Sequence, residues 1–250
     1  MDKINQKLDF DQIFVQVYKQ PVTNTKPYKK LVSFRRFLTF TAEPGIRIIE
    51  VFELIEKAEQ ECNKEEKARL KQTYLVFFGV CVIVSKKRNY ESILYFTGLL
   101  VLDFDHLENA AEFKQFLFEE YRCIIACWLS PSRRGVKAIV RIPAVETVEQ
   151  FKEYFFGIAA EMDQYNGFDH SGQNCVLPLF QSYDPDLLER DDAEIWEIKG
   201  TKRNDFTAAP TKVRTGIKPN DHDKETVINR KSHAFVTIIT ARFPTCCPYP

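Results

Sequence analysis

The sequence predicts an α+β fold, and three observations support this class. The chain has 250 residues, 44% of them hydrophobic and 28% charged, which provides enough apolar side chains for a buried core. Some stretches alternate apolar and polar residues, as half-buried strands do, and others repeat apolar residues at helical spacing. From residue 93 onward these stretches follow one another in the order β-α-β-β-α-β, which indicates a sheet covered by helices.

The first ninety residues predict an N-terminal α/β extension. Residues 11–19 alternate in polarity and predict a strand, whereas residues 31–40 fit neither pattern and their state is left open. Residues 46–71 predict one long amphipathic helix, because apolar residues recur at three-residue steps between Glu and Lys. Residues 74–84 are apolar and rich in β-formers, so they predict a further strand.

The central part of the chain predicts a ferredoxin-like or RRM-like core over about residues 93–190. A sheet of this kind has helices on one face and leaves the other face open to a ligand. The expected elements are a buried strand at 93–105, a helix at 108–121, strands at 123–129 and 136–142 around a polar turn at 130–135, a helix at 147–162 and a short last strand at 179–183.

The end of the chain differs in composition from the rest. We take residues 1–198 as one domain and residues 199–231 as a basic flexible linker, since the latter lack apolar periodicity and are rich in Lys, Asn, Thr, Asp and Pro. Residues 234–239 are strand-like within a C-terminal tail, 232–250, which we suspect is truncated or altered.

Charge is zero overall but unevenly placed. Residues 1–50 hold 9 basic and 5 acidic residues, residues 199–231 hold 9 and 4, and residues 51–198 hold 16 and 26. An acidic centre between basic ends fits a divalent-metal site flanked by segments that attract a polyanion such as template DNA. Chance clustering of charges on solvated faces explains the pattern equally well.

Several classes of protein are disfavoured. No apolar run reaches the ~18 residues that a membrane span needs, and the polar N-terminal residues lack a signal-peptide core. The seven cysteines form no paired CxxC array, so neither a disulfide framework nor a zinc site is indicated. We therefore expect a cytoplasmic protein with no membrane partner.

The first candidate functional cluster is the pair Asp103 and Asp105 in the stretch LLVLDFDHL. Side chains alternate along a strand, so both carboxylates lie on one face, while Leu100, Leu102 and Phe104 face the helices. Adjacent carboxylates repel each other unless a cation lies between them, and oxygen-only ligands suit Mg²⁺ or Mn²⁺. The alternative is a polar strand end with Asp105 as a turn or cap residue.

The second cluster is the stretch SPSRRGVK, residues 130–137. Backbone N–H groups together with Arg and Lys side chains can cradle a phosphate. The alternative is a solvated basic hairpin turn. The candidate phosphate-contacting residues are Ser130, Ser132, Arg133, Arg134 and Lys137, with Arg141 farther along the following strand on the same face as Lys137.

The third cluster begins at Asp169, in the stretch GFDHSGQN, which could provide a third carboxylate ligand or simply an Asp/Gly turn. The neighbouring His170 is weak evidence for a site, and Tyr183 either stacks on a base or packs in the fold. Together the three clusters describe a nucleotide–metal site of the kind that transfers nucleotidyl groups with two metal ions.

A family resemblance rests on the same motifs. Thr97-Gly98 precedes LLVLDFDHL, the turn is SPSRRGVK, and DHSGQN is followed by SYDPD. In these motifs the chain resembles the archaeo-eukaryotic primase superfamily and, most closely, its VirE-type N-terminal domain family of primase-polymerase-like proteins. The resemblance covers roughly residues 70–190.

The resemblance implies an archaeo-eukaryotic primase-like fold and metal-dependent nucleotidyl transfer on a single-stranded DNA or RNA template, in the replication of bacterial or mobile-element DNA. It implies that Asp103, Asp105 and Asp169 hold Mg²⁺ or Mn²⁺, and that Ser130, Ser132 and Lys137 contact the nucleoside triphosphate. It also implies a helicase-like ATPase as a partner.

Two departures from the family pattern leave alternatives open. Arg133 stands where the family has Gly, and Val176-Leu177-Pro178 stands where it has Ser-Arg before a strand. These departures are compatible with a catalytically inactive nucleic-acid-binding module on the same fold. A phosphatase that uses the DxD pair is less favoured, because His106-Leu107 follows that pair.

Overall fold

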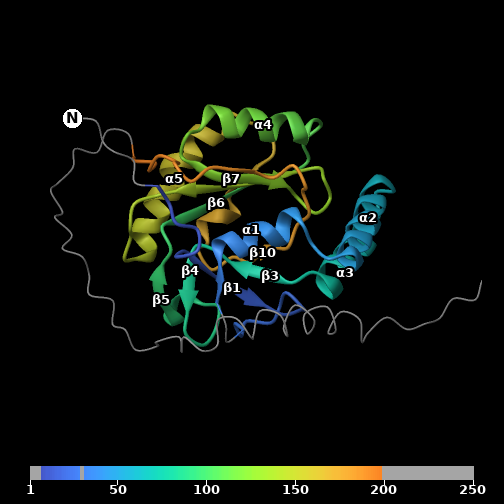
Figure 1. Ribbon diagram of the computed structural model, residues 1–250, viewed down its shortest axis with the longest axis horizontal. Coiled ribbons are helices and arrows are strands. Elements are labelled where there is room, and N and C mark those ends of the chain that lie inside the picture. Colours follow the sequence, from blue (N-terminus) through green and yellow to red (C-terminus); the bar gives the residue numbers. More distant parts are fainter. Residues whose placement is uncertain (1–6, 29–30, 199–250) are drawn as a thin grey trace, which may run out of the picture. The chain divides into compact units, whose positions relative to one another are not determined.

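The computed structural model describes residues 7–28 and 31–198 (Figure 1). The chain divides into two units, residues 1–199 and 200–250, and every described residue belongs to the first. The predicted linker at 199–231 and the predicted tail at 232–250, with its strand-like stretch, lie outside the described residues.

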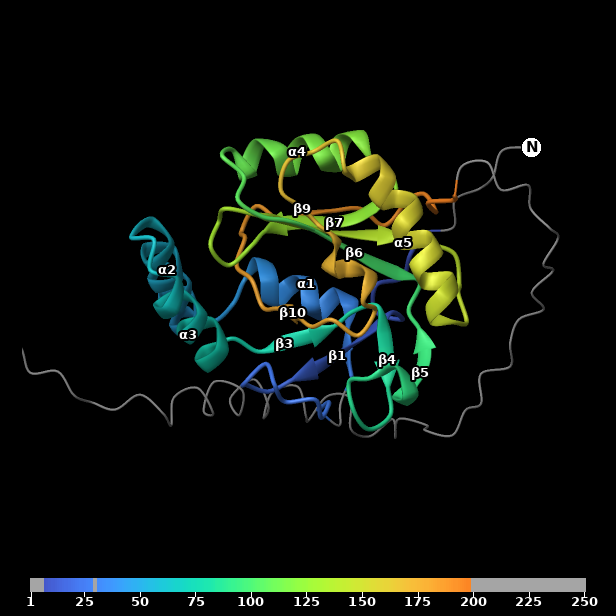
Figure 2. The same ribbon diagram turned by 180° about the vertical axis from the view of Figure 1, so that it is seen from behind.

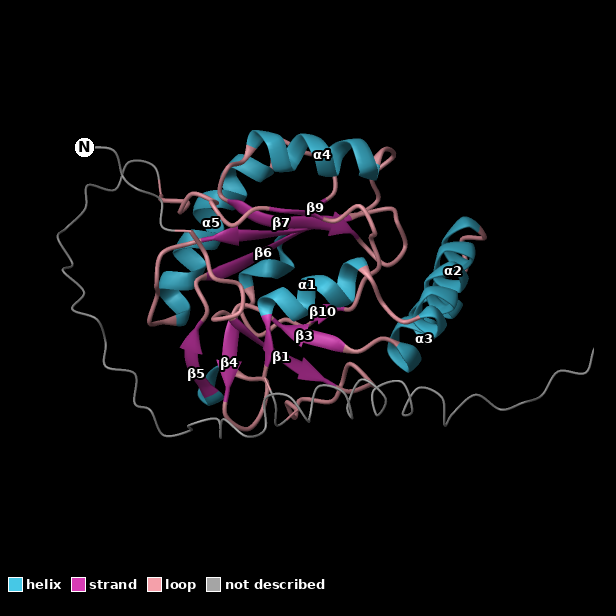
Figure 3. Ribbon diagram, viewed as in Figure 1, coloured by secondary structure: helices cyan, strands magenta, loops and turns pink. Residues whose placement is uncertain are grey.

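The α+β class is confirmed by five helices and antiparallel sheets in the described part of the chain (Figure 3). The main sheet has the strand order β11-β7-β8-β6-β9, and each neighbouring pair is antiparallel. Its strands are β6 (Leu99–Phe104), β7 (Ile124–Leu129), β8 (Val136–Arg141), β9 (Phe168–Asp169) and β11 (Leu188–Glu189). The helices α4 (Ala110–Glu120) and α5 (Val148–Met162) cover one face.

A second sheet lies across helix α1 (Phe34–Ala42) from the main sheet (Figures 1 and 2). Its order is β10 (Leu179–Phe180), β3 (Phe77–Gly79), β1 (Phe14–Tyr18) and β2 (Val32–Ser33). The ring of Phe37 on α1 lies 5.5 Å from that of Trp128 on β7 and 4.8 Å from that of Phe78 on β3. Helix α1 therefore packs between the two sheets with aromatic contacts, so the face of the main sheet that was expected to be open is partly covered.

The stretch at 31–40, whose state the sequence left open, forms β2 and the start of α1. Ser33 lies at the boundary, where its hydroxyl oxygen accepts a hydrogen bond from the backbone N–H of Arg36 at 3.2 Å. This bond satisfies one of the free N–H groups of the first helical turn.

The predicted helix at 46–71 is wrong in one respect, because it is two helices, α2 (Ile46–Gln60) and α3 (Lys64–Tyr74). Cys62 has a φ of 55°, which turns the chain, and the Asn63 side chain caps α3 by accepting from the N–H of Glu66 at 3.0 Å. The two helices pack against each other as a hairpin.

Two predicted strands are each divided between sheets. The stretch at 74–84 gives β3 and β4 (Val82–Val84), and the stretch at 93–105 gives β5 (Ile93–Phe96) and β6. β4 and β5 form a separate two-stranded sheet. The chain turns at Gly98, whose φ of +76° is one that L side chains rarely adopt. Both halves of each stretch are apolar, so hydrophobicity does not reveal the turn.

The predicted last strand of the main sheet is also corrected. Leu179–Phe180 forms β10, which pairs with β3 in the second sheet, and the place beside β6 is taken by β9, which precedes the short 3-10 helix η2 (His170–Gln173). β9 has only two residues, too few for a period-two pattern to be detected. The remaining predicted elements, which give β1, α4, β7, β8 and α5, are confirmed.

The core lies between the main sheet and its two helices. Leu100, Leu102 and Phe104 are fully buried in one cluster with residues of α4 and α5, as alternation along β6 predicts. Asp103 therefore faces away from α4 and α5. No helix among the described residues is long and apolar enough to cross a membrane.

Candidate metal and nucleotide site

The candidate site forms where three strands of the main sheet meet at the end of β6. Asp103 lies opposite Lys137 of β8 on one side and opposite Asp169 of β9 on the other. Directly opposed residues on antiparallel strands have their side chains on the same face, close to each other. The register therefore places two carboxylates and one ammonium group in a row across the sheet.

Asp105 completes a group of three carboxylates, which we call the acidic triad: Asp103, Asp105 and Asp169. One ligand oxygen of each lies within 4.8 Å of the others. Asp169 is fixed by Ser171, whose backbone N–H and hydroxyl donate to its two oxygens at 2.8 and 2.7 Å. The structure thus brings together all three carboxylates that the sequence proposed as metal ligands, at a spacing at which their charges repel one another.

Asp103 is the most constrained member of the acidic triad. Its Oδ2 accepts a hydrogen bond from the Nζ of Lys137, while its Oδ1 is buried and has no hydrogen-bond partner among the described residues. Burial raises the pKa of Asp103 above its ordinary value, the nearby Lys137 opposes that shift, and Asp105 and Asp169 add to it. A buried carboxylate oxygen without a partner is a costly feature that a bound cation would relieve.

Two glycines let the chain close tightly around Asp105. A Cβ on Gly167, whose φ is +83°, would lie 2.1 Å from the carbonyl oxygen of Asp105, and a Cβ on Gly135 would lie 2.4 Å from that of Phe104. The N–H of Asp105 donates to the carbonyl of Gly167 at 2.8 Å. A larger residue at either position would clash with the backbone at Phe104 or Asp105 and force it to shift.

The turn at 130–135 lies against the acidic triad. Ser130 Oγ and Asp105 Oδ1 are each 3.0 Å from the point that a Cβ on Gly135 would occupy. Ser130 Oγ is also 3.4 Å from Ser132 Oγ, and both serines are buried. The structure thus gathers Ser130, Ser132 and Lys137 next to the carboxylates.

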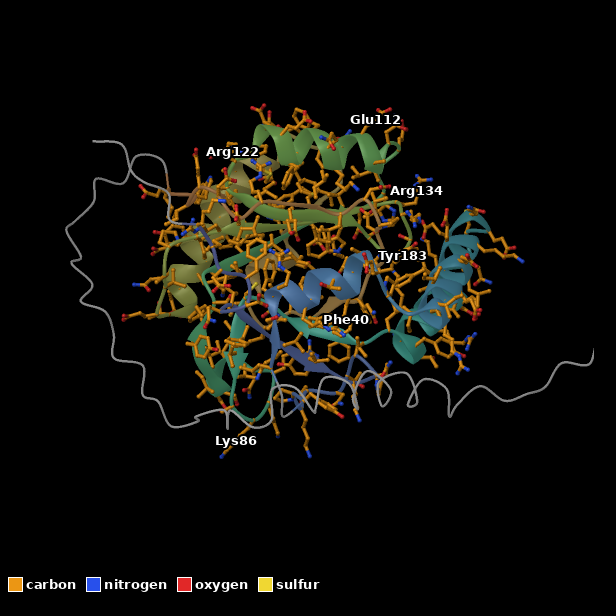
Figure 4. All side chains as sticks on the ribbon, viewed as in Figure 1. Phe40, Lys86, Glu112, Arg122, Arg134 and Tyr183 are labelled. Carbon is orange, nitrogen blue, oxygen red and sulfur yellow. The ribbon has the colours of Figure 1, made fainter. Side chains whose placement is uncertain are left out.

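The two arginines of this turn point in different directions. Arg133 has a φ of 55°, pairs with Glu56 of α2 at 3.3 Å and lies over the Tyr183 ring at 5.5 Å. Arg134 is exposed, and its Nε donates to the carbonyl of Leu107 at 3.1 Å. Figure 4 shows Arg134 and Tyr183 both toward the side of the molecule that carries α2.

Three other candidate residues are engaged elsewhere. Arg141 lies opposite Leu99, at the far end of β8 from Lys137, and donates to the carbonyl of Ala193 at 2.7 Å. The Nε2 of His170 is 2.8 Å from Asp163, and its ring packs on Phe168 at 5.1 Å. Tyr183 is half-buried and packs near Phe52 of α2, with 6.1 Å between ring centroids.

Sequence reasoning missed Lys71 of α3, which lies half-buried near the site. Burial lowers the pKa of Lys71, and the charges of Lys67 and Lys137 lower it further, whereas Asp105 opposes the shift. The sequence predicted one long helix at 46–71, in which Lys71 looked like one of many solvated charges. The signal that could have revealed it is Asn63 followed three residues later by Glu66, a pattern typical of a helix start.

Comparison with known proteins gives one match. The family model of the BT4734-like, N-terminal domain matches residues 69–188, a range that contains the acidic triad and the turn at 130–135. No curated protein and no solved structure matches the chain. This match corrects the resemblance inferred from the motifs: the family found is neither the VirE-type N-terminal domain family nor a primase family, and nothing links the chain to the primase superfamily.

Proposed function

We propose that this protein catalyses metal-dependent nucleotidyl transfer on a single-stranded nucleic-acid template. The observation that carries the proposal is the acidic triad at the end of β6, with Lys137 opposite Asp103 and a buried Asp103 oxygen that no described residue bonds to. Three carboxylate oxygens in this arrangement match the ligand preference of Mg²⁺ and Mn²⁺.

The roles follow from position. Asp103, Asp105 and Asp169 would hold divalent ions, which when bound neutralise charge on the transferred phosphate. Lys137, Ser130 and Ser132 would hold the triphosphate of the incoming nucleotide. The 3′-hydroxyl oxygen of the growing strand attacks the α-phosphorus, and the bond to the β-phosphate breaks. Pyrophosphate leaves with the electron pair, and the hydroxyl proton passes to water.

The sheet supports this assignment at the level of fold. The strands β7-β8-β6-β9 are all antiparallel and connected through α4 and α5 in the order β-α-β-β-α-β. This is the connectivity of a ferredoxin-like or RRM-like sheet, and we include that finer fold in the proposal. The acidic triad then lies on the sheet face away from its two helices.

One observation favours a second candidate, a nucleic-acid-binding module without catalysis. The Lys137 ammonium group already neutralises Asp103, so the site has a cation of its own. In that case the strand would bind without any divalent ion, and replacing Asp103 would leave binding intact.

Nucleotide incorporation on a primed single-stranded template, with Mg²⁺ or Mn²⁺, tests the proposal. We expect product from the parent and at least a hundredfold less from Asp103→Asn and Asp105→Asn, which keep side-chain volume. Asp192→Asn is the matched control, because its carboxylate is exposed and pairs with Arg122 instead. Unchanged incorporation by Asp103→Asn would contradict the proposal. If the parent binds the template but makes no product, the non-catalytic binding module is favoured instead.

A further inference from the structure

The hairpin formed by β4 and β5 carries a loop whose composition differs from that of the rest of the domain. Its sequence at residues 85–92 is SKKRNYES, in which Lys86 and Lys87 are exposed and Tyr90 is 44% exposed. Glu91 is the acidic residue of the loop and is also exposed. Figure 4 shows Lys86 at the tip of this hairpin, away from the two larger sheets. Exposed lysines and an exposed aromatic ring therefore occur together here.

Beside this loop the surface has a hollow of about 310 Å³. Its walls come from the hairpin loop, from α5 and from η2 with the residues that follow it. They consist of Tyr90, Lys152, Ser171, Gln173, Asn174 and Leu177. The Tyr90 hydroxyl donates to Asn174 Oδ1 at 3.1 Å, and Lys152 Nζ lies 6.0 Å from the centre of the Tyr90 ring. The hollow thus combines an aromatic face, an ammonium group and side-chain amides.

One residue, Ser171, contacts both the hollow and the acidic triad. Ser171 lines the hollow, and the same Ser171 donates two hydrogen bonds to Asp169. Gly172 next to it packs on β6, where an added Cβ would lie 2.6 Å from the carbonyl oxygen of Val101. The wall of the hollow is therefore hydrogen-bonded to a carboxylate of the acidic triad.

We propose that the loop at 85–92 and this hollow bind single-stranded nucleic acid and lead it to the acidic triad. The inference rests on the proposed function, which names no side chains that contact the template strand. Single strands are bound by aromatic rings on which bases stack, together with cations that follow the phosphates. Tyr90 provides the ring, Lys86, Lys87 and Lys152 provide the cations, and the amides of Gln173 and Asn174 can bond to base edges.

Fluorescence anisotropy of a labelled sixteen-nucleotide oligo(dT) with the full chain, in EDTA and without nucleotide, tests this path. Tyr90→Ala should weaken binding about fivefold to a hundredfold, which corresponds to the loss of one stacked base. Tyr90→Phe keeps the ring and should bind within about twofold of the parent. Phe116→Ala is the matched control, since Phe116 is 43% exposed on α4, and it should leave binding unchanged.

The lysines are tested through salt dependence. For Lys86→Ala/Lys87→Ala, the slope of log affinity against log salt should fall by about 1.4, at roughly 0.7 for each lost phosphate contact. Lys64→Ala, an exposed lysine at the start of α3, should leave the slope unchanged. Oligo(rU) and a DNA duplex in parallel show whether DNA or RNA is preferred and whether the site requires a single strand.

The outcomes separate this inference from the proposed function. If Tyr90→Ala and the double lysine variant both bind as tightly as the parent, the proposed path is wrong. Nucleotidyl transfer still stands in that case, provided that the parent incorporates nucleotide. Equal weakening by Tyr90→Phe and Tyr90→Ala, or duplex binding as tight as single-strand binding, also overturns it. If the parent binds the oligonucleotide but does not incorporate nucleotide, and the hairpin variants lose binding, the result supports the path and contradicts nucleotidyl transfer.

Discussion

Two Lys–Asp pairs, one buried and one partly buried, lie near the two ends of the turn at 130–135, and they differ in how completely the Asp oxygens are hydrogen-bonded. Lys114 of α4 pairs with Asp184 at 2.8 Å, with side chains 6% and 1% exposed. Asp184 also accepts from the N–H groups of Leu129 and Asp186, so both of its oxygens have partners. In the pair of Lys137 with Asp103, one Asp103 oxygen has no partner in the part of the chain that the structure describes.

This difference separates a structural ion pair from a candidate binding site. A buried carboxylate with every oxygen bonded fixes the elements around it and has no capacity for a ligand. The Lys114 pair joins α4, the end of β7 and the segment after β10 in this way. The Lys137 pair instead leaves an oxygen open beside two more carboxylates, which is the arrangement expected where a cation binds.

The largest expected effect is on stability, from Lys114→Met. Removing one partner of a fully buried ion pair leaves an uncompensated charge, which typically costs about 3–5 kcal/mol. Lys137→Met is the matched variant, and we expect it to cost less than half as much, because the side chains of this pair are 11% and 17% exposed and water can solvate the remaining charge. Urea unfolding followed by circular dichroism measures both losses. Equal losses would contradict the distinction between the two pairs.

The sequence predicts interactions within one element better than pairs between residues that are far apart in the chain. The alternation that placed Asp103 and Asp105 on one face and Leu102 on the other is a local property of β6, and it holds in the structure. The partner of Lys114 lies 70 residues away in the chain. No periodicity links those two residues, so the structural pair could not be predicted.

The same limit applies to the elements. Helices α4 and α5 were predictable because each has a complete apolar face that packs on one sheet. The division at Gly98 was not, because this left-handed residue interrupts a stretch that is apolar on both sides. The division at Cys62 was overlooked, although Asn63 and Glu66 form a pattern typical of a helix start. Lys71 remained hidden for that reason, although α3 brings it near Lys137.

The next effect in size is metal binding at the acidic triad. With free Mn²⁺ a hundredfold above its Kd, the parent should gain about 2.7 kcal/mol of stability, seen as a higher Tm. Asp103→Asn and Asp169→Asn should lose this gain, while Asp192→Asn keeps it. If Mn²⁺ stabilises all variants equally, the ion binds elsewhere, and neither Lys–Asp pair is then distinguished as a metal site.

The pH dependence of this binding sharpens the comparison. Burial holds the pKa of Asp103 above its ordinary value of 3.8, so as the pH falls toward that raised pKa the carboxyl takes up a proton that competes with the metal. The apparent Mn²⁺ affinity should therefore decrease from pH 7.5 to pH 5.5 in the parent. Isothermal titration calorimetry at both pH values measures it, and an affinity that rises on acidification would contradict the assignment.

The smallest effect concerns the turn that lies between the two pairs. Arg133 has a left-handed φ of 55°, a conformation that costs a residue with a Cβ about 1–2 kcal/mol and costs glycine little. Arg133→Gly and Arg133→Ala both lose the contacts with Glu56 and Tyr183, so the difference between them isolates the backbone. We expect the glycine variant to be about 1 kcal/mol more stable than the alanine variant in urea unfolding. An alanine variant at least as stable would mean that the turn relaxes, and that the position of Lys137 after it does not depend on this strained residue.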